Sequence, residues 1–388
     1  MAGVSALSAE ILLSKRVQEM VLNGEEPQNL YISRDDCTDE AIPSPPSDPI
    51  PIIDLSLLSS AEPCSAQELQ RLRLALCSWG CFQLKRTWLK KAKATSFAIV
   101  ESDSFCAPCY VGKATCGFQA TGHGIAKSFL DKIREVARDF FEQPAEEKRR
   151  HAKGVEEFEG YGADPVPAEG QSLDWSDRLF LDVYPEDRRK HRFWPENPKS
   201  FRKVLEEYTS RMQILTELVS KAMAKSLNLE ADCFLNQFGE RAALQARFNY
   251  YSRCQRPDLV LGLKAHADGS GYTIILQDDV EGLQIFKDER WITAPSISDA
   301  LLVLMGDQME IMTNGIFKSP VHRVLTSSEK ERISVAVFYT PEPNKEIGPE
   351  EGLVNEERPR IYKKVKDYAG VHWEYYQQGK RALHVAEV

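Results

Sequence analysis

The chain has 388 residues, of which 42% are hydrophobic and 28% charged, with a formal net charge of −9. This composition is typical of a globular protein with a large core. The negative charge argues against a nucleic-acid partner, which would require a basic face. No apolar run approaches the roughly 18 residues of a membrane-spanning helix, and the N-terminal stretch resembles neither a signal peptide nor a transit peptide. We therefore expect a cytoplasmic protein whose nine cysteines are mostly reduced.

The first part of the chain is predicted to be mainly helical. Apolar residues at helical spacing, followed by glycine, proline or polar turns, predict helices over 5–25, 65–79, 126–151 (ending near Pro144), 199–228 and 232–239. Between the first two, residues 35–48 are rich in Asp, Pro and Ser and are predicted to form a loop, and IPIIDL (50–55) is predicted to be a short strand.

From Ala246 onwards, short apolar runs alternate with turn residues. The predicted strands are ARFNYYS, LVLGLKAHAD, GYTIILQ, GLQIFKDERWI, ALLVLMGD, MEIMTNGIF, HRVLTS and RISVAVFYTP. Strands at this spacing predict an all-β barrel or sandwich, and helices followed by strands give an α+β layout. The tail, 358–383, is predicted to return to helix. We divide the chain into an N-terminal region (1–245), a β-rich core (246–345) and a C-terminal tail (346–388).

The stretch AHADGSGYT (265–273) contains a histidine and an aspartate two positions apart, His266 and Asp268. Residues i and i+2 of a strand point to the same face, so both side chains could enter one cavity. The next histidine, His322, follows 56 residues later in another strand-like run. Two histidines and one carboxylate suit non-haem Fe(II) with open coordination positions, although zinc would also accept them.

A second pair of residues follows in RISVAVFY, where Arg332 and Ser334 share a strand face. A guanidinium and a hydroxyl form a good carboxylate clamp, because the guanidinium fork matches two carboxylate oxygens. Each motif alone is common by chance. Their occurrence in order within one β-rich region predicts a metal site that faces an anionic, metal-chelating co-substrate.

The sequence resembles the plant 2-oxoglutarate- and Fe(II)-dependent dioxygenases over most of its length, in a branch that acts on specialised metabolites. The matching motifs are IPIIDL (50–55), WGCFQ (79–83), GHGI (122–125), NYYSRC (249–254), PDLVLGLKAHADGS (257–270), EGLQIFKDERWI (281–292), GDQMEIMTNGIFKSPVHRV (306–324) and RISVAVF (332–338). The last four are specific when they occur together.

The resemblance implies a double-stranded β-helix, or cupin-like jelly roll, with flanking helices. It implies that His266, Asp268 and His322 bind Fe(II), with 2-oxoglutarate and O2 as co-substrates and ascorbate as reductant; no catalytic residue beyond the metal centre is expected. It assigns the far carboxylate of 2-oxoglutarate to the clamp described above. Asn249 and Tyr251 would help to position this co-substrate, although Ser252 replaces the proline that normally follows.

The implied reaction hydroxylates or O-demethylates a small plant-type metabolite and releases succinate and CO2. Phe180 and Phe338 are candidate walls of the substrate pocket, although both could be ordinary core aromatics. We expect a monomer without nucleic-acid or membrane partners. Two alternatives stay open at this point. One is an inactive or misfolded variant that acts at most as a binding shell, and the other is an enzyme similar to aminocyclopropane-carboxylate oxidase, which uses ascorbate instead of 2-oxoglutarate.

Residues 84–119 interrupt the family pattern between WGCFQ and ATGHGI. Removing them restores WGCFQATGHGI, because the segment ends in a second Phe-Gln pair. The leading interpretation is that the segment is not evolved structure, as in a translated intron or a faulty gene model. The others are a genuine surface excursion and a small metal-binding knob formed by Cys106, Cys109, Cys116 and His123.

Overall fold

The computed structural model describes residues 16–33, 49–58, 63–85, 124–154, 157–164 and 171–388. The helices are α2 (Val17–Leu22), α3 (Leu55–Leu58), α4 (Pro63–Ser78), α5 (Lys127–Phe141), α6 (Ala145–Arg149), α7 (Phe201–Ser226), α8 (Cys233–Phe238), α9 (Asp307–Met312) and α10 (Tyr368–Gln377). The strands are β1 (Ile52–Ile53), β2 (Cys81–Lys85), β3 (Gly160–Gly162), β4 (Asp177–Tyr184), β5 (Ala243–Tyr251), β6 (Leu261–His266), β7 (Tyr272–Gln277), β8 (Leu283–Lys287), β9 (Arg290–Thr293), β10 (Ala300–Met305), β11 (His322–Leu325), β12 (Arg332–Thr340), β13 (Glu346–Ile347) and β14 (Val365–Lys366).

The larger sheet has eight strands in the order β1-β2-β10-β7-β12-β5-β4-β3. Within it, β5 and β12 are antiparallel and in register along nine residues, from Arg332 opposite Tyr251 to Thr340 opposite Ala243. The sheet is covered on both faces, which explains why β10 (ALLVLM) is apolar and buried at every position instead of alternating.

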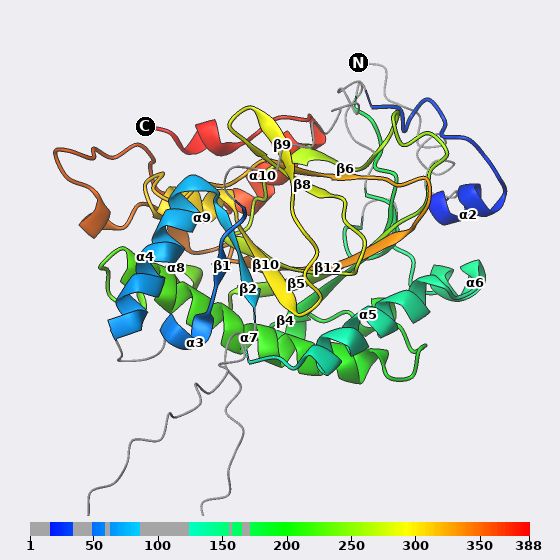
Figure 1. Ribbon diagram of the computed structural model, residues 1–388, viewed down its shortest axis with the longest axis horizontal. Helices are drawn as coiled ribbons and strands as arrows, with labels where there is room; N and C mark the ends of the chain where they lie inside the picture. Colours follow the sequence, from blue (N-terminus) through cyan, green and yellow to red (C-terminus); the bar gives the residue numbers. More distant parts are fainter. Residues whose placement is uncertain (1–15, 34–48, 59–62, 86–123, 155–156, 165–170) are drawn as a thin grey trace, which may run out of the picture.

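The smaller sheet has four strands in the order β6-β11-β8-β9. It lies opposite the larger sheet, above it in Figure 1. Between the sheets is an apolar cluster with members from both, such as Leu263 and Val324 from the smaller sheet and Ile275, Leu304 and Ala336 from the larger one. This packing of two sheets, with helices on the outside, is the predicted α+β jelly-roll architecture.

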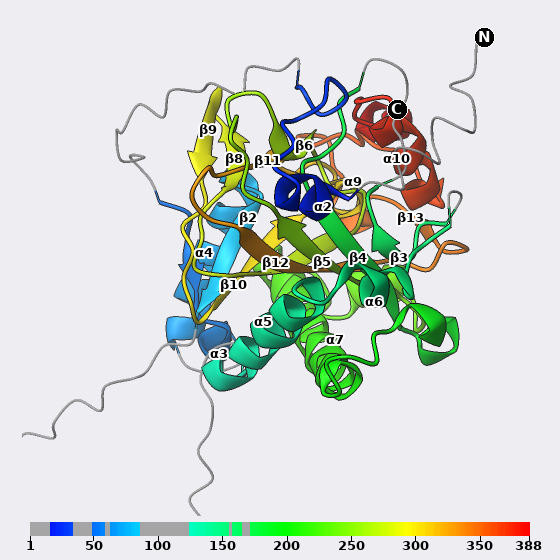
Figure 2. The same cartoon turned by 90° about the vertical axis from the view of Figure 1, so that its right-hand side faces the viewer.

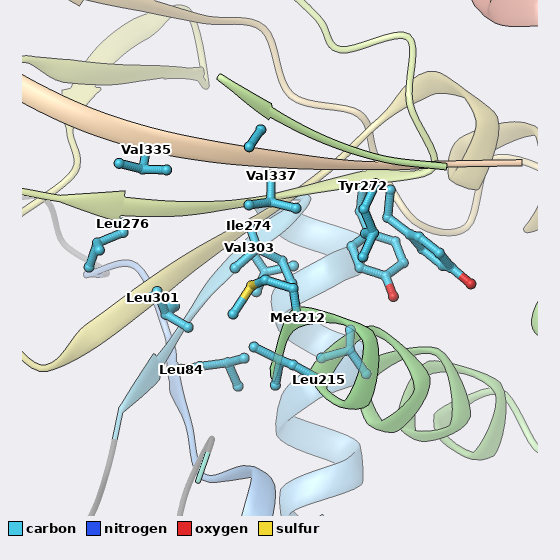
Figure 3. Packing of buried hydrophobic residues seen from close by; sticks show 14 of the residues in the cluster. Leu84, Met212, Leu215, Tyr272, Ile274, Leu276, Leu301, Val303, Val335 and Val337 are labelled. Carbon is cyan, nitrogen blue, oxygen red and sulfur yellow. The ribbon is translucent and has the colours of Figure 1, made fainter. Parts of the chain in front are cut away.

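The helices α4, α5 and α7 cover the outer face of the larger sheet (Figures 1 and 2). The long helix α7 buries residues at a three- and four-residue spacing, including Leu205, Met212, Leu215 and Val219. Figure 3 shows Met212 and Leu215 against sheet residues such as Ile274, Leu301 and Val303. The main hydrophobic core therefore lies between α7 and the sheet, away from the space between the two sheets.

Several elements differ from their predictions. The run MEIMTNGIF contains helix α9 instead of a strand, because Asp307 and Gln308 begin a helical turn that donates backbone N–H groups to the loop after β6. The predicted end of the helix over 126–151 near Pro144 is confirmed by α5, and the residues after the proline form a separate short helix, α6. In the tail, only α10 and short 3₁₀ turns are helical, and β14 precedes α10. Strands β3 and β4 were not predicted.

Some predictions concern residues that are not described. Of the helix predicted over 5–25, the described part forms α2; the remainder, the loop at 35–48 and Cys106, Cys109, Cys116 and His123 lie outside the described residues. The insertion at 84–119 overlaps the described part only at the end of β2. The predicted boundary at 245/246 falls within β5, and β1 to β4 of the N-terminal region join the same sheet as the core strands. Among the described helices, none is both long and apolar enough to cross a membrane.

We predict that Leu301→Ala lowers the free energy of unfolding by about 2–5 kcal/mol, as is usual when a buried leucine leaves a cavity. Leu301 has no exposed surface and lies within the main core. The matched control is Leu74→Ala on α4, where 59% of the side chain is exposed. Urea unfolding at equilibrium measures the free energy of unfolding of both variants. An equal decrease in the two would contradict the position of the main core between α7 and the larger sheet.

Candidate active site

Two histidines lie opposite each other on neighbouring strands of the smaller sheet. His266 is the last residue of β6, His322 is the first residue of β11, and the two are directly paired in the antiparallel register. Their ring centroids are 4.3 Å apart, and both side chains are largely buried. The pairing of the two strands thus brings together two residues that are 56 positions apart in the sequence.

Asp268 completes the group, but it lies beyond the end of β6 and not on the strand itself. Its Oδ1 atom is 3.4 Å from Nε2 of His266 and 3.7 Å from Nε2 of His322. The loop is held by the start of α9, where the N–H of Asp307 donates to the carbonyl of Asp268 at 2.7 Å. The structure thus brings the three predicted side chains together, although Asp268 reaches the histidines from a loop and not by strand alternation.

Both imidazoles are oriented by backbone carbonyls. Nδ1 of His266 lies 2.8 Å from the carbonyl oxygen of Lys264, and Nδ1 of His322 lies 3.2 Å from that of Pro320. With a proton on Nδ1, each ring donates to its carbonyl and leaves the Nε2 lone pair for a metal. In the described part of the chain, these three residues are the group whose ligand atoms lie within 4.8 Å of one another.

The surroundings favour the protonation states that a metal requires. Burial, assisted by His266, lowers the pKa of His322 to about 4, so the ring is neutral at pH 7. Burial alone would raise the pKa of Asp268, but the two histidines and a hydrogen bond from Thr273 hold it well below its usual range. The Thr273 hydroxyl donates to Oδ2 of Asp268 at 2.5 Å, which leaves Oδ1 directed at the histidines. The neutral ring of His322 and the carboxylate of Asp268 can bind a divalent metal without first losing protons.

A buried guanidinium lies at the start of β12. Arg332 donates through Nε to the carbonyl of Val280 at 3.1 Å and through Nη2 to the side chain of Gln277 at 2.9 Å. Its Nη1 is buried without a protein partner, and its guanidinium lies over the ring of Tyr251, 5.1 Å from the centroid. A buried donor without a partner is costly, and an anion in the adjacent cavity would satisfy it.

The neighbouring residues of the predicted clamp lie on the paired strands β5 and β12. Ser334 is opposite Asn249, whose Nδ2 donates to the serine hydroxyl at 3.3 Å. Gly262 on β6 leaves room for the ring of Tyr251, because a Cβ there would lie 2.7 Å from Tyr251 Cδ1. The structure thus brings Asn249, Tyr251, Arg332 and Ser334 to the cavity that the two histidines and Asp268 also line.

Two cavities meet at His266 and Asp268. The inner one is lined by residues of both sheets. The outer one is larger and shares Arg247, His266, Asp268 and Phe338 with it. Two of the three candidate metal ligands therefore face both cavities, whereas His322 lines only the inner one.

The outer cavity has aromatic walls. The predicted Phe180 and Phe338 both line it, with ring centroids 6.1 Å apart and nearly parallel planes. Sequence reasoning missed Phe158, whose ring packs edge-on against those of Phe180 and Trp373. It also missed Trp373 and Tyr376 of α10, which line the same cavity. Aromatic residues three positions apart on a predicted tail helix were the available signal. The ring of Tyr376 also lies edge-on to His266, at a centroid distance of 5.4 Å.

A buried charge cluster supports the wall that β4 and β5 form. Asp164 accepts hydrogen bonds from Arg247 on β5, at 2.9 and 3.2 Å, and from Arg178 on β4. Burial would raise the pKa of Asp164, but the two guanidinium groups hold it well below its usual range. Arg247 in turn donates to Asn249 at 2.6 Å, which connects this cluster to the clamp. Sequence reasoning did not identify this cluster, since its members are far apart in the sequence and form no motif.

Comparison with known proteins identifies two family models in the chain. One, described as the 2OG-Fe(II) oxygenase superfamily, matches residues 243–341. The other, the N-terminal part of non-haem dioxygenases in morphine synthesis, matches residues 114–197. This second match begins within the insertion, so it includes the second Phe-Gln pair and leaves out WGCFQ (79–83).

Several curated proteins are similar to the chain. Codeine O-demethylase of Papaver somniferum is 35% identical over 358 residues, which cover 92% of this chain and 87% of that protein. Flavonol synthase/flavanone 3-hydroxylase of Eustoma exaltatum subsp. russellianum is 41% identical over 257 residues, 65% of this chain and 77% of that protein. The crystal structure of JOX2 in complex with 2OG, Fe and JA is 31% identical, has a TM-score of 0.76, and covers 96% of this chain and 98% of that one.

We predict that Asp164→Asn lowers the free energy of unfolding by about 3–5 kcal/mol, because it leaves two buried guanidinium groups without a counter-charge. The matched control is Asp187→Asn, which removes an exposed ion pair with Arg241 and should leave the free energy of unfolding nearly unchanged. Urea unfolding measures both variants. A loss as small as that of the control would show that the cluster does not stabilise the sheet.

Proposed function

Because the chain belongs to the 2OG-Fe(II) oxygenase superfamily, we propose that His266, Asp268 and His322 bind the Fe(II) of a 2-oxoglutarate-dependent dioxygenase that oxidises a small organic molecule. The observation that supports this most directly is the convergence of three ligand atoms within 4.8 Å, beside a buried Arg332 that has one donor without a partner. Two imidazoles and one carboxylate leave open positions on the metal, as the 2-His-1-carboxylate enzymes require. Iron is preferred to zinc on account of the neighbouring anion clamp.

The clamp holds the co-substrate in this proposal. Arg332 and Ser334 bind the far carboxylate of 2-oxoglutarate, while Asn249 and Tyr251 fix its direction toward the metal ligands. The guanidinium fork suits a planar carboxylate, and burial strengthens such charge-assisted hydrogen bonds. Ser252, in place of the usual proline, follows the last residue of β5 and removes none of these groups.

When bound, iron and 2-oxoglutarate supply the activation of O2, with one oxygen atom entering succinate and the other the substrate, and with release of CO2. The residues of this chain orient the reactants and shield them from water. The aromatic walls around Phe180 and Phe338 bind the substrate and direct one C–H bond to the open side of the metal ligands. Insertion of oxygen at a ring or chain carbon gives a hydroxylated product. Insertion at an O-methyl carbon gives a hemiacetal, which releases formaldehyde and leaves the demethylated hydroxyl group. The names of the relatives include both a demethylase and a hydroxylase, which supports both outcomes.

We also propose that the protein is a monomer in the cytoplasm and that ascorbate is the reductant that keeps its iron in the Fe(II) state. Dependence on 2-oxoglutarate, rather than on ascorbate alone, separates this enzyme from the aminocyclopropane-carboxylate-oxidase type. The complex of JOX2 with 2OG supports an enzyme that depends on 2-oxoglutarate.

The function is tested by succinate formation from 2-oxoglutarate with Fe(II), ascorbate and a panel of phenolic and indolic substrates. We expect turnover that needs both Fe(II) and 2-oxoglutarate. The assay is run on the full chain and on a chain that lacks 84–119. Turnover by the shortened chain alone would make the full chain a defective form; failure of both to bind Fe(II) and 2-oxoglutarate would refute the proposal.

We predict that His322→Ala abolishes turnover and weakens Fe(II) binding, since it removes one of three protein ligands. Unchanged activity would exclude His322 from the metal site. Anaerobic titration with Fe(II) measures binding separately from turnover, and the circular dichroism spectrum of the variant shows whether the fold is retained.

We predict that Arg332→Gln raises the concentration of 2-oxoglutarate needed for half-maximal rate about tenfold or more, because hydrogen bonds to charged groups contribute about 1.5–3 kcal/mol. The affinity for Fe(II) should stay close to that of the unaltered chain. The matched control is Arg290→Gln, at an exposed position of β9. An unchanged requirement for 2-oxoglutarate in the Arg332 variant would place the clamp elsewhere.

A further inference from the structure

Two buried carboxylates lie on α9, one helical turn apart. Asp307 has no exposed surface and Glu310 has very little. Like charges at this spacing repel each other on a helix, and burial increases the repulsion. The pair therefore requires a cation and hydrogen-bond donors close by.

Arg381, which follows α10, supplies the cation. Its Nη2 lies 2.9 Å from Oδ1 of Asp307, 3.1 Å from Oε2 of Glu310 and 3.1 Å from the carbonyl oxygen of Ser319. One guanidinium thus joins the C-terminal segment, helix α9 and the chain that leads into β11. Nε also donates to Oδ1 of Asp307 at 3.3 Å, so the guanidinium contacts this carboxylate through two nitrogens, which the single nitrogen of lysine cannot do.

The first connection from this cluster leads to Asp268. The N–H of Asp307 donates to the carbonyl of Asp268 at 2.7 Å. Gln308 holds the next two residues of the same loop, with its backbone N–H on the carbonyl of Ser270 at 3.2 Å and its side chain on that of Gly269 at 2.7 Å. A shift of the first turn of α9 would therefore move Asp268.

The second connection leads to His322. Oε2 of Glu310 accepts the N–H of Ser319 at 2.7 Å, while the Ser319 carbonyl accepts from Arg381. The next residue, Pro320, supplies the carbonyl that orients the ring of His322 at 3.2 Å. Both backbone polar groups of Ser319 are thus fixed by the cluster three residues before the metal ligand.

We propose that Arg381 is a positioning residue of the metal centre: it fixes α9 and Ser319 together, and so sets the distance between Asp268 and His322. The inference rests on the proposed function, because it assumes that these two residues bind the metal. Arg381 makes no contact with the metal ligands themselves, and acts through Asp307, Glu310 and Ser319.

The test is the affinity of the full chain for Co(II), a redox-stable probe for Fe(II), measured by calorimetry without oxygen-dependent turnover. We expect Arg381→Gln to bind Co(II) about 10- to 100-fold more weakly, the usual effect of losing a group that orients metal ligands. The matched control is Arg360→Gln, in the same C-terminal segment, whose guanidinium pairs with Glu351 at 2.7 Å on the surface. This variant should bind Co(II) with unchanged affinity.

Arg381→Lys keeps the charge and permits part of the hydrogen bonding, and it covers the case in which the glutamine variant does not fold. We expect this variant to melt close to the unaltered chain and to have an intermediate Co(II) affinity. A residue with a purely structural role would lower the melting temperature and leave the affinity of the folded protein unchanged, and that result would overturn the inference. Failure of the unaltered chain to bind Co(II) would instead refute the metal site, and with it the proposed function.

Discussion

The antiparallel pairing of β6 with β11 is the constraint on which the site depends. It sets His266 directly opposite His322, so the separation of the two imidazoles follows from the spacing of adjacent strands. The loop after β6 then has only to bring one carboxylate to this pair. A second pairing, of β5 with β12, places Arg332 opposite Tyr251 and Ser334 opposite Asn249. The two imidazoles and the residues of the proposed anion clamp are thus each positioned by strand register, and they line one cavity between the two sheets.

Three buried aspartates near this site are each paired with positively charged groups or hydrogen-bond donors. Asp268 is buried against two imidazoles and a hydroxyl, and Asp164 against two guanidinium groups. Asp307 is held by Arg381 and by the hydroxyl of Tyr368 at 2.8 Å. Buried charges are tolerated only when they are paired in this way. The arrangement keeps polar groups fixed next to a cavity that must accept both an anion and an apolar molecule.

Much of this could be predicted from the sequence, for reasons that particular residues make clear. His266, Asp268, His322, Arg332 and Ser334 occur in short motifs with strand periodicity, and the structure brings them to one cavity. Helix α7 could be predicted because its buried face repeats regularly along 26 residues. Helix α9 could not, because it is short and buried on all sides, so it lacks the one-sided pattern that distinguishes a helix from a strand.

Contacts between residues that are far apart in the sequence could not be predicted either. Phe158, Trp373 and Tyr376 line the outer cavity together, although more than two hundred residues separate the first from the other two. Asp164 pairs with Arg178 and Arg247 on different strands. Such contacts have no local spacing that a single sequence reveals, since they arise only when the helices and sheets pack.

The strand pairings have a consequence for how the protein folds. Cys81 lies opposite Leu304, Tyr251 opposite Arg332, and His266 opposite His322. Contacts between residues so far apart in sequence form slowly, because the entropy of closing each long loop is lost before the contact can compensate for it. A chain in which β6 and β11 have not yet paired therefore keeps its candidate ligands apart. Binding of the proposed iron would thus be coupled to folding, because the three ligands converge only when these strands and the loop after β6 are in place.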